Sequence, residues 1–529
     1  MSERLLEGPE MDVATMADWA VSRTPEKLAV VEGNKRLTYR EWGERVDRLA
    51  RHLVRLGIGR GDRVACMLKN REEHATTFFA VQKLGAVATP FNFRVKRDGI
   101  VYHVNDSGAK ALVFDDDVAE EVLVVRELMP GCEHYICVGK GRVEGVLPFE
   151  ELMSEEVPPV EFPALSGDDP SVILYTSGTT GTPKGVLITH SASLARAYGL
   201  ILNHGQRHMD GERAIGLMPL FHTVGLHTVL LGTVLLNGTY FPVERFSPVD
   251  VLDLIERERI TYLFGTPTHF QMLLAEDLSA RDLSSVRHAL YAGALMPGRL
   301  ARECSEKLTE NFTLIYGNTE TYNSLFMRNT HRRPGAAVCG VLHEARVVEL
   351  GGTHEDVVAP GEEGELIVNV RSPESFREYW NKPEQTADKV REGWYYTGDS
   401  CLYEVKDGQP LFTITGRIDD LIISGGENIH PAEIENLLAS HPGVSDVAVV
   451  GAPDLRWGEV VKAFVVRSDP SLTEKQLDNF FKESSLENYK RPRSYEFLSE
   501  IPRNPSGKIL RAQLKEREGK RDLGEKVGS

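Results

Sequence analysis

Long apolar runs are missing from the sequence. No segment approaches the roughly 18 consecutive apolar residues that a membrane-spanning helix needs, and the nearest, residues 228–236, is short and broken by Gly232. The first residues, MSERLLEGPEM, contain acids and no apolar core, so neither a secretory signal nor an Arg-rich transit peptide is expected. These absences favour a cytoplasmic protein without an integral membrane segment.

Cysteine is scarce and scattered. The six cysteines show neither CxxC spacing nor the Cys/His spacing of a zinc site, which argues against a disulfide framework and a structural zinc. We expect no catalytic thiol, and buried thiols that act as small apolar side chains, at Cys66, Cys132, Cys137, Cys304, Cys339 and Cys401.

Positive charge is also in deficit. The chain has 61 Lys and Arg against 78 Asp and Glu, a formal net charge of -17, and such a surface repels phosphate backbones. Nucleic acid is therefore a poor partner. One short basic cluster, Lys490, Arg491 and Arg493 beside Tyr489, suits a small phosphorylated ligand better.

The length and composition indicate a globular chain with more than one domain. There are 529 residues, of which 41% are hydrophobic and 26% charged. From Tyr39 to about Phe264, helical-period stretches alternate with short β-branched runs, for example residues 63–68, 111–114 and 171–175. This alternation indicates βαβ units and mostly parallel sheets.

The pattern changes after Pro360. Shorter, Gly-rich strands at residues 364–368 and 411–415 indicate an antiparallel β subdomain that ends near Gly416. A compact α+β pattern follows, with helices at 431–439 and 473–482 and strands at 444–451, 460–466 and 495–498. We therefore predict an α/β fold with a large N-terminal domain, residues 1–416, and a small α+β C-terminal domain, residues 417–529.

The most informative stretch is YTSGTTGTPKG, residues 175–185, directly after an apolar run. Glycines let backbone amides approach an anion, while hydroxyls and one lysine add donors and charge, as a polyphosphate requires. It is not the GxxxxGK[ST] loop, and no GxGxxG opens a βαβ unit here. A flexible surface loop is the alternative for any Gly/Ser/Thr run, but the order of these residues favours a phosphate loop.

This loop and five further motifs resemble the acyl-adenylate-forming family of acyl-CoA synthetases, firefly-type luciferases and peptide synthetase adenylation domains. The motifs occur in the family's order: YGNTE at 316–320, YTGD at 396–399, GRIDD at 416–420, GGENIHP at 425–431 and PRNPSGK at 502–508. The resemblance covers nearly the whole chain. It implies a ligase that uses ATP and Mg²⁺ to activate a carboxylic acid as its acyl-adenylate and then passes the acyl group to coenzyme A.

The resemblance implies four catalytic residues. Lys508 matches the cation that stabilises the pentavalent transition state when a carboxylate attacks the α-phosphorus of ATP. Glu320 matches the magnesium ligand, and Thr176 and His222 complete the set. A lone lysine or glutamate would otherwise be interpreted as a solvated surface charge.

The resemblance also implies a nucleotide site. Tyr316 matches the ring that packs on adenine, and Asp399, joined by Arg417, matches the ribose ligand. Without the accompanying motifs, Tyr316 would be a core tyrosine and Asp399 a turn residue. The remaining implied nucleotide-binding residues are Ser177, Gly178, Thr179, Thr180, Gly181, Lys184, Gly317 and Thr319.

Family members are similar in using two arrangements of a mobile C-terminal domain, which implies a hinge at Asp419. In the second arrangement, Lys508 swings away, and Gly425 and Gly426 line a pantetheine tunnel too narrow for a Cβ. No carrier-protein domain follows Ser529, which favours free CoA. The implied CoA nucleotide site, for which a solvated basic turn is the alternative, comprises Trp457, Tyr489, Arg491 and Arg493.

Within the family, the chain looks most like 4-halobenzoate CoA ligases and their aryl-CoA relatives. The supporting runs are GLMPLFH at 216–222, FGTPTH at 264–269, NSLFMR at 323–328 and DLRWG at 454–458. The implied acyl pocket, largely apolar or aromatic as a flat ring requires, comprises Arg94, His222, Thr223, Val224, Phe264, Ala292, Ile315, Gly317, Tyr322 and Asn323.

Two departures affect the substrate prediction. Gly199 stands where the halobenzoate enzymes have an aromatic wall, so we expect a larger pocket. Tyr322 replaces a methionine and adds a hydroxyl. A larger or hydroxylated aryl acid is therefore the predicted substrate.

Other interpretations remain open. They are a ligase for medium-chain or branched fatty acids, a luciferase-like oxygenase that oxidises its adenylate, and a catalytically dead adenylate-binding regulator. The dead protein requires damage to Lys508, Glu320 or the phosphate loop, and all three are intact. The sequence does not decide between a monomer and a homodimer.

Overall fold

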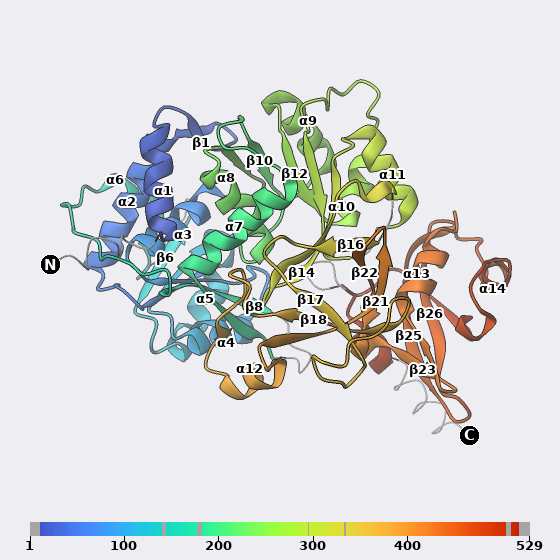
Figure 1. The fold of residues 1–529 in the computed structure, drawn as a ribbon. Coiled ribbons are helices and arrows are strands. Elements are labelled where there is room, and N and C mark those ends of the chain that lie inside the picture. Colours follow the sequence, from blue (N-terminus) through green and yellow to red (C-terminus); the bar gives the residue numbers. More distant parts are fainter. Residues whose placement is uncertain are drawn as a thin grey trace.

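The computed structural model describes residues 11–139, 144–176, 182–294, 296–332, 335–503 and 509–517. In these residues the strands form three sheets, and helices pack against them (Figure 1). The fold is mixed α/β, which confirms the predicted class. No helix within this part of the chain is long and apolar enough to cross a membrane.

The largest sheet has fourteen strands in the described residues. Its order is β17-β18-β21-β22-β16-β15-β14-β13-β12-β10-β11-β1-β2, with β20 beside β21. The stretch from β1 through β11, β10, β12 and β13 to β14 is parallel, and the remaining pairs are antiparallel. The strands are β1 (Leu28–Glu32), β2 (Lys35–Thr38), β10 (Arg213–Gly216), β11 (Thr239–Pro242), β12 (Tyr262–Gly265), β13 (His288–Tyr291), β14 (Phe312–Asn318), β15 (Tyr322–Met327), β16 (Ala336–Cys339), β17 (Ala345–Val348), β18 (Glu363–Asn369), β20 (Val390–Arg391), β21 (Trp394–Lys406) and β22 (Gln409–Arg417).

The second sheet is parallel except at one edge. Its order is β19-β9-β8-β4-β3-β5-β6-β7, and only the β8–β9 and β9–β19 pairs are antiparallel. The predicted strands at 63–68, 111–114 and 171–175 are confirmed as β3, β5 and β8. The strands are β3 (Arg63–Met67), β4 (Val87–Pro90), β5 (Ala111–Asp115), β6 (His134–Val138), β7 (Leu147–Pro148), β8 (Pro170–Thr176), β9 (Lys184–Thr189) and β19 (Glu378–Tyr379).

Helices cover these two sheets. They are α1 (Val13–Arg23), α2 (Tyr39–Arg55), α3 (Glu72–Lys83), α4 (Arg97–Ser107), α5 (Ala119–Val124), α6 (Phe149–Ser154), α7 (His190–His204), α8 (Gly232–Leu235), α9 (Pro248–Glu258), α10 (Pro267–Leu274), α11 (Gly298–Lys307) and α12 (Pro383–Lys389). A capping box starts α2, where the Thr38 hydroxyl accepts from the Glu41 amide and the Glu41 carboxylate accepts from the Thr38 amide.

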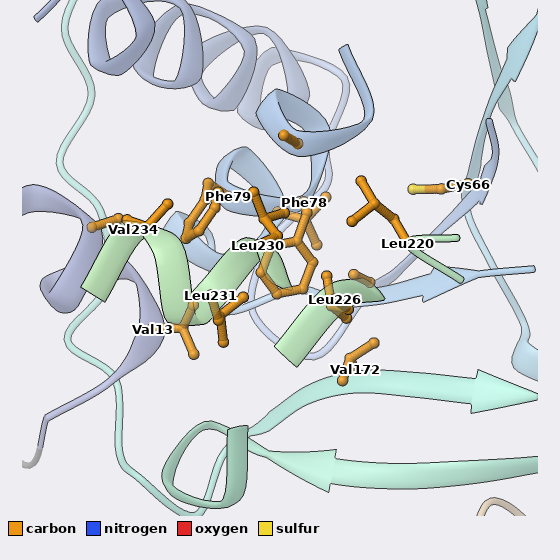
Figure 2. Packing of buried hydrophobic residues seen from close by; sticks show 14 of the residues in the cluster. Val13, Cys66, Phe78, Phe79, Val172, Leu220, Leu226, Leu230, Leu231 and Val234 are labelled. Atoms are coloured by element: carbon orange, nitrogen blue, oxygen red, sulfur yellow. The ribbon is translucent and has the colours of Figure 1, made fainter. Parts of the chain in front are cut away.

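The core that positions the site lies around α3 and a π-helical segment, Val224–Leu231. All twelve residues of α3 are buried. Phe78 and Phe79 lie beside Leu226 and Leu230 of the π-helical segment in Figure 2. The apolar stretch nearest in character to a membrane span is therefore core, and the π-helical segment begins directly after Thr223 of the predicted acyl pocket.

The antiparallel subdomain differs from its prediction in extent. The strands predicted at 364–368 and 411–415 are confirmed as β18 and β22, but β16 and β17 belong to the same antiparallel set. The prediction that this pattern starts only after Pro360 was wrong. The reason is that β16 pairs with β15, so the antiparallel strands continue the parallel sheet rather than forming a separate layer.

The chain beyond Arg417 forms the third sheet, of order β24-β23-β26-β25 with β27 beside β26. The helix predicted at 431–439 is confirmed with the same bounds, the three strands are confirmed with small extensions, and the helix predicted at 473–482 starts one residue later. The elements are β23 (Ile422–Ser424), β24 (Glu427–Ile429), α13 (Pro431–Ala439), β25 (Val444–Asp454), β26 (Gly458–Arg467), α14 (Glu474–Lys482) and β27 (Ser494–Leu498). Their apolar side chains form a cluster of their own, which includes Ile434 and Phe481.

All six cysteines are free thiols, and five of them are buried, whereas Cys339 is half-buried. Burial raises the pKa of the Cys66 thiol to about 12 and that of Cys137 to about 11. The thiolate is thus disfavoured, as expected for cysteines that serve as small apolar side chains.

Candidate functional site

The predicted phosphate loop joins two antiparallel strands. Thr176 ends β8 and pairs with Lys184, the first residue of β9. Ser177, Gly178, Thr179, Thr180 and Gly181 lie outside the described residues. The two strand ends therefore fix both sides of the loop, and β9 in turn pairs with β19.

Tyr379 of β19 connects the loop lysine with the predicted magnesium ligand. Its hydroxyl donates to Glu320 Oε1 at 2.7 Å, and Lys184 Nζ lies 4.9 Å from the centre of its ring. Burial, together with the charge of Glu320, raises the pKa of Tyr379, so its hydroxyl stays a donor. Two motifs 136 positions apart, Lys184 and Glu320, thus meet through a residue that belongs to neither.

A tight hairpin presents Glu320. Asn318 Oδ1 accepts from the Thr321 amide at 2.7 Å and from the Thr321 hydroxyl at 3.1 Å. A Cβ at Gly317 would lie 1.8 Å from the Tyr322 carbonyl oxygen, so the hairpin requires glycine at this position. Glu320 is consequently held in the turn between β14 and β15 with 7% of its surface exposed.

Glu320 is the predicted magnesium ligand among the described residues. Among them no group of three or more His, Cys, Asp and Glu side chains could hold a metal ion. Mg²⁺ in nucleotide enzymes takes one or two carboxylates and completes its shell with phosphate oxygens and water. Glu320, beside the phosphate loop, fits a magnesium ion of this kind.

The predicted adenosine residues meet at Asp399. Arg417 Nη1 lies 3.0 Å from Asp399 Oδ1, because the two residues face each other across β21 and β22. The Tyr316 hydroxyl donates to the other carboxylate oxygen, Asp399 Oδ2. Burial and the Asp399 charge raise the pKa of Tyr316 well above its usual value. Each oxygen of Asp399 keeps a lone pair with which it could accept a ribose hydroxyl.

The predicted acyl residues fall into a buried and an accessible group. Phe264 and Ile315 are buried, and Val224 and Ala292 pack partly buried against the same core. Arg94 is exposed and lies over Phe93, whose ring meets Phe221 at 6.0 Å. Phe221 in turn packs 4.6 Å from His222. This aromatic row connects Arg94 to His222.

The Tyr322 hydroxyl is engaged inside the protein. It shares a hydrogen bond of 2.6 Å with Thr228 Oγ1, which also accepts from Asn323 Nδ2 at 3.3 Å. Tyr322 is fully buried and has a left-handed backbone, φ 59°. The hydroxyl predicted to add polarity to the pocket thus already has a protein partner.

The expectation that Gly199 enlarges the pocket was wrong. A Cβ at Gly199 would lie 1.6 Å from Glu374 Oε1 and 3.2 Å from Leu342 Cδ1. The space that the missing side chain leaves is filled by the Glu374 carboxyl group. Nothing in the local sequence reveals this, because the two residues are 175 positions apart.

Arg196 of α7 is a second residue that the motifs missed. It is fully buried and donates to the Glu374 carbonyl at 2.8 Å, to Thr223 Oγ1 at 3.1 Å and to the Thr319 carbonyl at 3.0 Å. Its guanidinium carbon lies 5.2 Å from the centre of the Tyr322 ring. One cation therefore ties the acyl residues to the segment that carries Glu320.

The predicted hinge and tunnel residues lie in the segment that leads into the third sheet. Asp419 is exposed in a 3₁₀ turn, Ile418–Asp420. Gly425 and Gly426 form the two-residue turn of the β23–β24 hairpin, with φ 62° and 91°. A Cβ at Gly425 would lie 2.7 Å from the Trp457 ring, whereas nothing lies within 4 Å of a Cβ at Gly426, where positive φ favours glycine. Their place in a pantetheine tunnel stays a prediction.

Three of the four predicted CoA residues are exposed at the surface. Trp457 and Tyr489 are each 41% exposed, and Arg493 is exposed. Trp457 packs on Gly425, whose amide donates to its carbonyl at 2.8 Å. Arg491, by contrast, forms an ion pair with Asp478 at 3.4 Å. Trp457, Tyr489 and Arg493 are thus accessible to a ligand, whereas Arg491 already has a protein partner.

One contact between a histidine and a carboxylate spans the predicted hinge. His430 Nε2, just before α13, lies 2.8 Å from Glu363 Oε1 of β18. The Thr415 and Ser400 hydroxyls donate to the same oxygen. Burial acts to raise the pKa of Glu363, but these hydrogen bonds and His430 outweigh it and lower that pKa to about 2. Glu363 is therefore ionised at any ordinary pH. The predicted catalytic Lys508 lies outside the described residues.

We expect Tyr379→Phe to raise the apparent KM for MgATP roughly tenfold, because a hydrogen bond to a charged group that becomes unpaired costs about 1.5–3 kcal/mol. Steady-state rates measured over a range of free Mg²⁺ test this. Tyr403→Phe, at a half-buried tyrosine elsewhere in the antiparallel sheet, is the matched control. An unchanged Mg²⁺ dependence in Tyr379→Phe would contradict a role in positioning Glu320.

Sequence comparison assigns this arrangement to a family. The profile described as AMP-binding enzyme matches residues 17–380, and that described as AMP-binding enzyme C-terminal domain matches residues 433–508. The chain belongs to the AMP-binding enzyme family. The resemblance to acyl-adenylate-forming enzymes that the motifs indicated is thereby confirmed.

Individual proteins are similar to this chain over nearly its whole length. A 4-chlorobenzoate–CoA ligase from an Arthrobacter species is 36% identical over 501 residues, 94% of each protein. A feruloyl-CoA synthase from an Amycolatopsis species is 37% identical over 511 residues, 95% of this chain and 99% of the relative. Among solved structures, an anthranilate CoA ligase in complex with anthranoyl-AMP has a TM-score of 0.88 and 27% identity, covering 98% of this chain and 99% of that chain.

Proposed function

We propose that this protein is an ATP-dependent carboxylic acid:CoA ligase that forms an acyl-adenylate and then a CoA thioester. The observation that supports this most directly is the Tyr379 contact between Lys184, at the end of the phosphate loop, and the buried carboxylate of Glu320. A lysine and a carboxylate so placed suit a polyphosphate with its magnesium ion. ATP, Mg²⁺ and CoA are the proposed cosubstrates and cofactor.

In the first step, a carboxylate oxygen of the acid attacks the α-phosphorus of ATP, and the bond to the bridging oxygen breaks to release pyrophosphate. Asp399 and Arg417 hold the ribose, and Tyr316 orients Asp399 through its hydroxyl. A magnesium ion on Glu320 would neutralise phosphate charge. Lys508 and the loop residues stabilise the charge of the transition state.

In the second step, the CoA sulfur attacks the acyl carbonyl carbon, the thiol proton passes to solvent, and the carbon–oxygen bond to AMP breaks. The residues beyond 416 rotate about Asp419 between the two steps under this proposal. Trp457, Tyr489 and Arg493 are exposed and suited to the CoA nucleotide. The division into residues 1–416 and 417–529 follows from this hinge.

The proposed acid is an aryl acid. The relatives reported above are named for chlorobenzoate, feruloyl and anthranilate substrates, all of which carry an aromatic ring. The buried predicted acyl residues, Phe264 and Ile315, provide apolar surface of the kind that a ring requires.

The test is CoA-dependent AMP release across benzoates, cinnamates, phenylacetates and medium-chain fatty acids. We expect AMP and pyrophosphate in equal amounts, no oxygen consumption, and kcat/KM at least tenfold higher for the best aryl acid than for any fatty acid. Activity confined to fatty acids would refute the aryl substrate, and AMP release coupled to oxygen uptake without CoA would refute the ligase.

A further inference from the structure

A buried carboxyl group fills the space beside Gly199. Glu374, in the loop before β19, has only 1% of its surface exposed. Its Oε1 lies where a side chain on α7 would begin, 1.6 Å from the position of a Cβ at Gly199, and its Cδ lies 2.8 Å from that position. Glu374 thus provides the surface that any larger residue at position 199 would otherwise provide.

The Arg196 side chain links the backbone of Glu374 to the predicted acyl residues. Arg196, three residues before Gly199 on α7, donates to the Glu374 carbonyl at 2.8 Å and to Thr223 Oγ1 at 3.1 Å. The same guanidinium lies over the Tyr322 ring. Arg196 thus contacts Thr223 and Tyr322 as well as Glu374, and the Glu374 carboxyl group lies beside Gly199, which is on the same helix as Arg196.

The hydrogen-bonding capacity of Glu374 is not used up. Its Oε2 is buried and has no hydrogen-bond partner in the described part of the chain. His343 Nε2 lies 3.4 Å from this Oε2 and 2.8 Å from the Thr321 carbonyl oxygen. A buried polar atom without a partner is rare in folded proteins and points to a ligand or a functional role.

The protonation state of this group sets what it can bind. Burial raises the pKa of Glu374 to about 9, although the charge of Arg196 acts in the opposite direction. At neutral pH the side chain is therefore a carboxylic acid with one O–H donor and free acceptor lone pairs. Such a group can pair with a hydroxyl or an amine, each of which both donates and accepts.

We propose that Glu374 is a specificity-determining residue that hydrogen-bonds a hydroxyl or amino substituent of the acyl group. The inference rests on the proposed ligase function and names the substrate class more closely: aryl acids with a polar ring substituent. A site built to hydrogen-bond a substituent discriminates against the analogue that lacks it, because the buried protein group is then left unpaired.

The experiment compares pairs of acids that differ in one substituent: benzoate with 3- and 4-hydroxybenzoate and with 3- and 4-aminobenzoate, and cinnamate with 4-hydroxycinnamate. The readout is kcat/KM for CoA-dependent AMP release. We expect the wild-type protein to favour at least one polar member over its unsubstituted partner by tenfold or more. A wild-type ratio below threefold in every pair overturns the proposal without any variant.

Two variants test whether Glu374 causes the preference for polar ring substituents. Glu374→Leu keeps the space beside Gly199 filled but cannot form the hydrogen bond, so the ratio should fall to about one through loss of activity on the polar acid. Glu374→Gln keeps a donor and an acceptor and should retain the ratio within about threefold. Glu310→Gln, at an exposed glutamate, is the matched control.

The outcomes separate this proposal from the proposed function. Equal loss of activity on both members of each pair in Glu374→Leu, with the wild-type ratio preserved, would show a merely structural carboxyl group and overturn the inference. Absence of CoA-dependent AMP release from every acid in the wild-type protein would instead refute the ligase itself. Thermal melting of each variant establishes that the comparison concerns folded protein.

Discussion

Lys508→Ala lowers the rate of acyl-adenylate formation by roughly 10²-fold or more, the scale found when one donor to a developing oxyanion is removed. The attacking carboxylate and the α-phosphate both carry negative charge, and a cation over both compensates their repulsion in the transition state. Pyrophosphate release in a single turnover measures this step. The second step, assayed with supplied acyl-adenylate and CoA, should stay within about threefold of wild type, because the proposed function assigns Lys508 to the first step alone.

Lys515→Ala is the control for this prediction. Lys515 is a lysine in the helical segment at residues 511–517, close in sequence to Lys508 but in none of the motifs. Its replacement should leave both steps unchanged. If Lys508→Ala formed the adenylate as fast as wild type, the assignment of this cation to the first step would be wrong.

Glu320→Gln should reduce kcat/KM for MgATP by about 10²-fold, since the amide keeps the shape of the side chain but loses the negative charge that binds the cation. It can still accept the hydrogen bond from Tyr379, so the loss reports charge rather than a collapsed hairpin. Raising free Mg²⁺ should recover part of the rate in Glu320→Gln. Initial rates across a Mg²⁺ titration give the result.

Glu378→Gln provides the comparison for Glu320→Gln. Glu378 is exposed on β19 next to Tyr379 and has no place in the motifs. A Mg²⁺ dependence in Glu320→Gln equal to that of Glu378→Gln and wild type would exclude Glu320 as the metal ligand.

Much of the fold could be predicted because its signals are local. Apolar runs marked β3, β5 and β8, and the proline that begins α13 allowed that helix to be predicted with its observed bounds. β16 and β17 were missed because four-residue strands carry too little periodicity, and their place depends on pairing with β15, β18 and β22.

In the candidate site, too, residues within short motifs could be predicted and residues that depend on long-range contacts could not. Motifs supplied Glu320, Asp399 and Arg417, and the structure brings Asp399 and Arg417 together as expected. The motifs did not predict three further residues: Tyr379, Arg196 and Glu374. Their contacts join segments that are 59, 123 and 175 positions apart in the sequence. Such partners are selected by the packing of strands and helices, and no short pattern encodes them.

The contact between His430 and Glu363 bears on the pace of the catalytic cycle. Its two residues lie on opposite sides of Asp419, so the proposed rotation there would break this contact and later form it again. Because Glu363 stays ionised, its carboxylate remains a hydrogen-bond acceptor for His430 across the ordinary pH range. The rate of domain rotation would then depend on how readily this contact breaks, independently of how tightly either substrate binds.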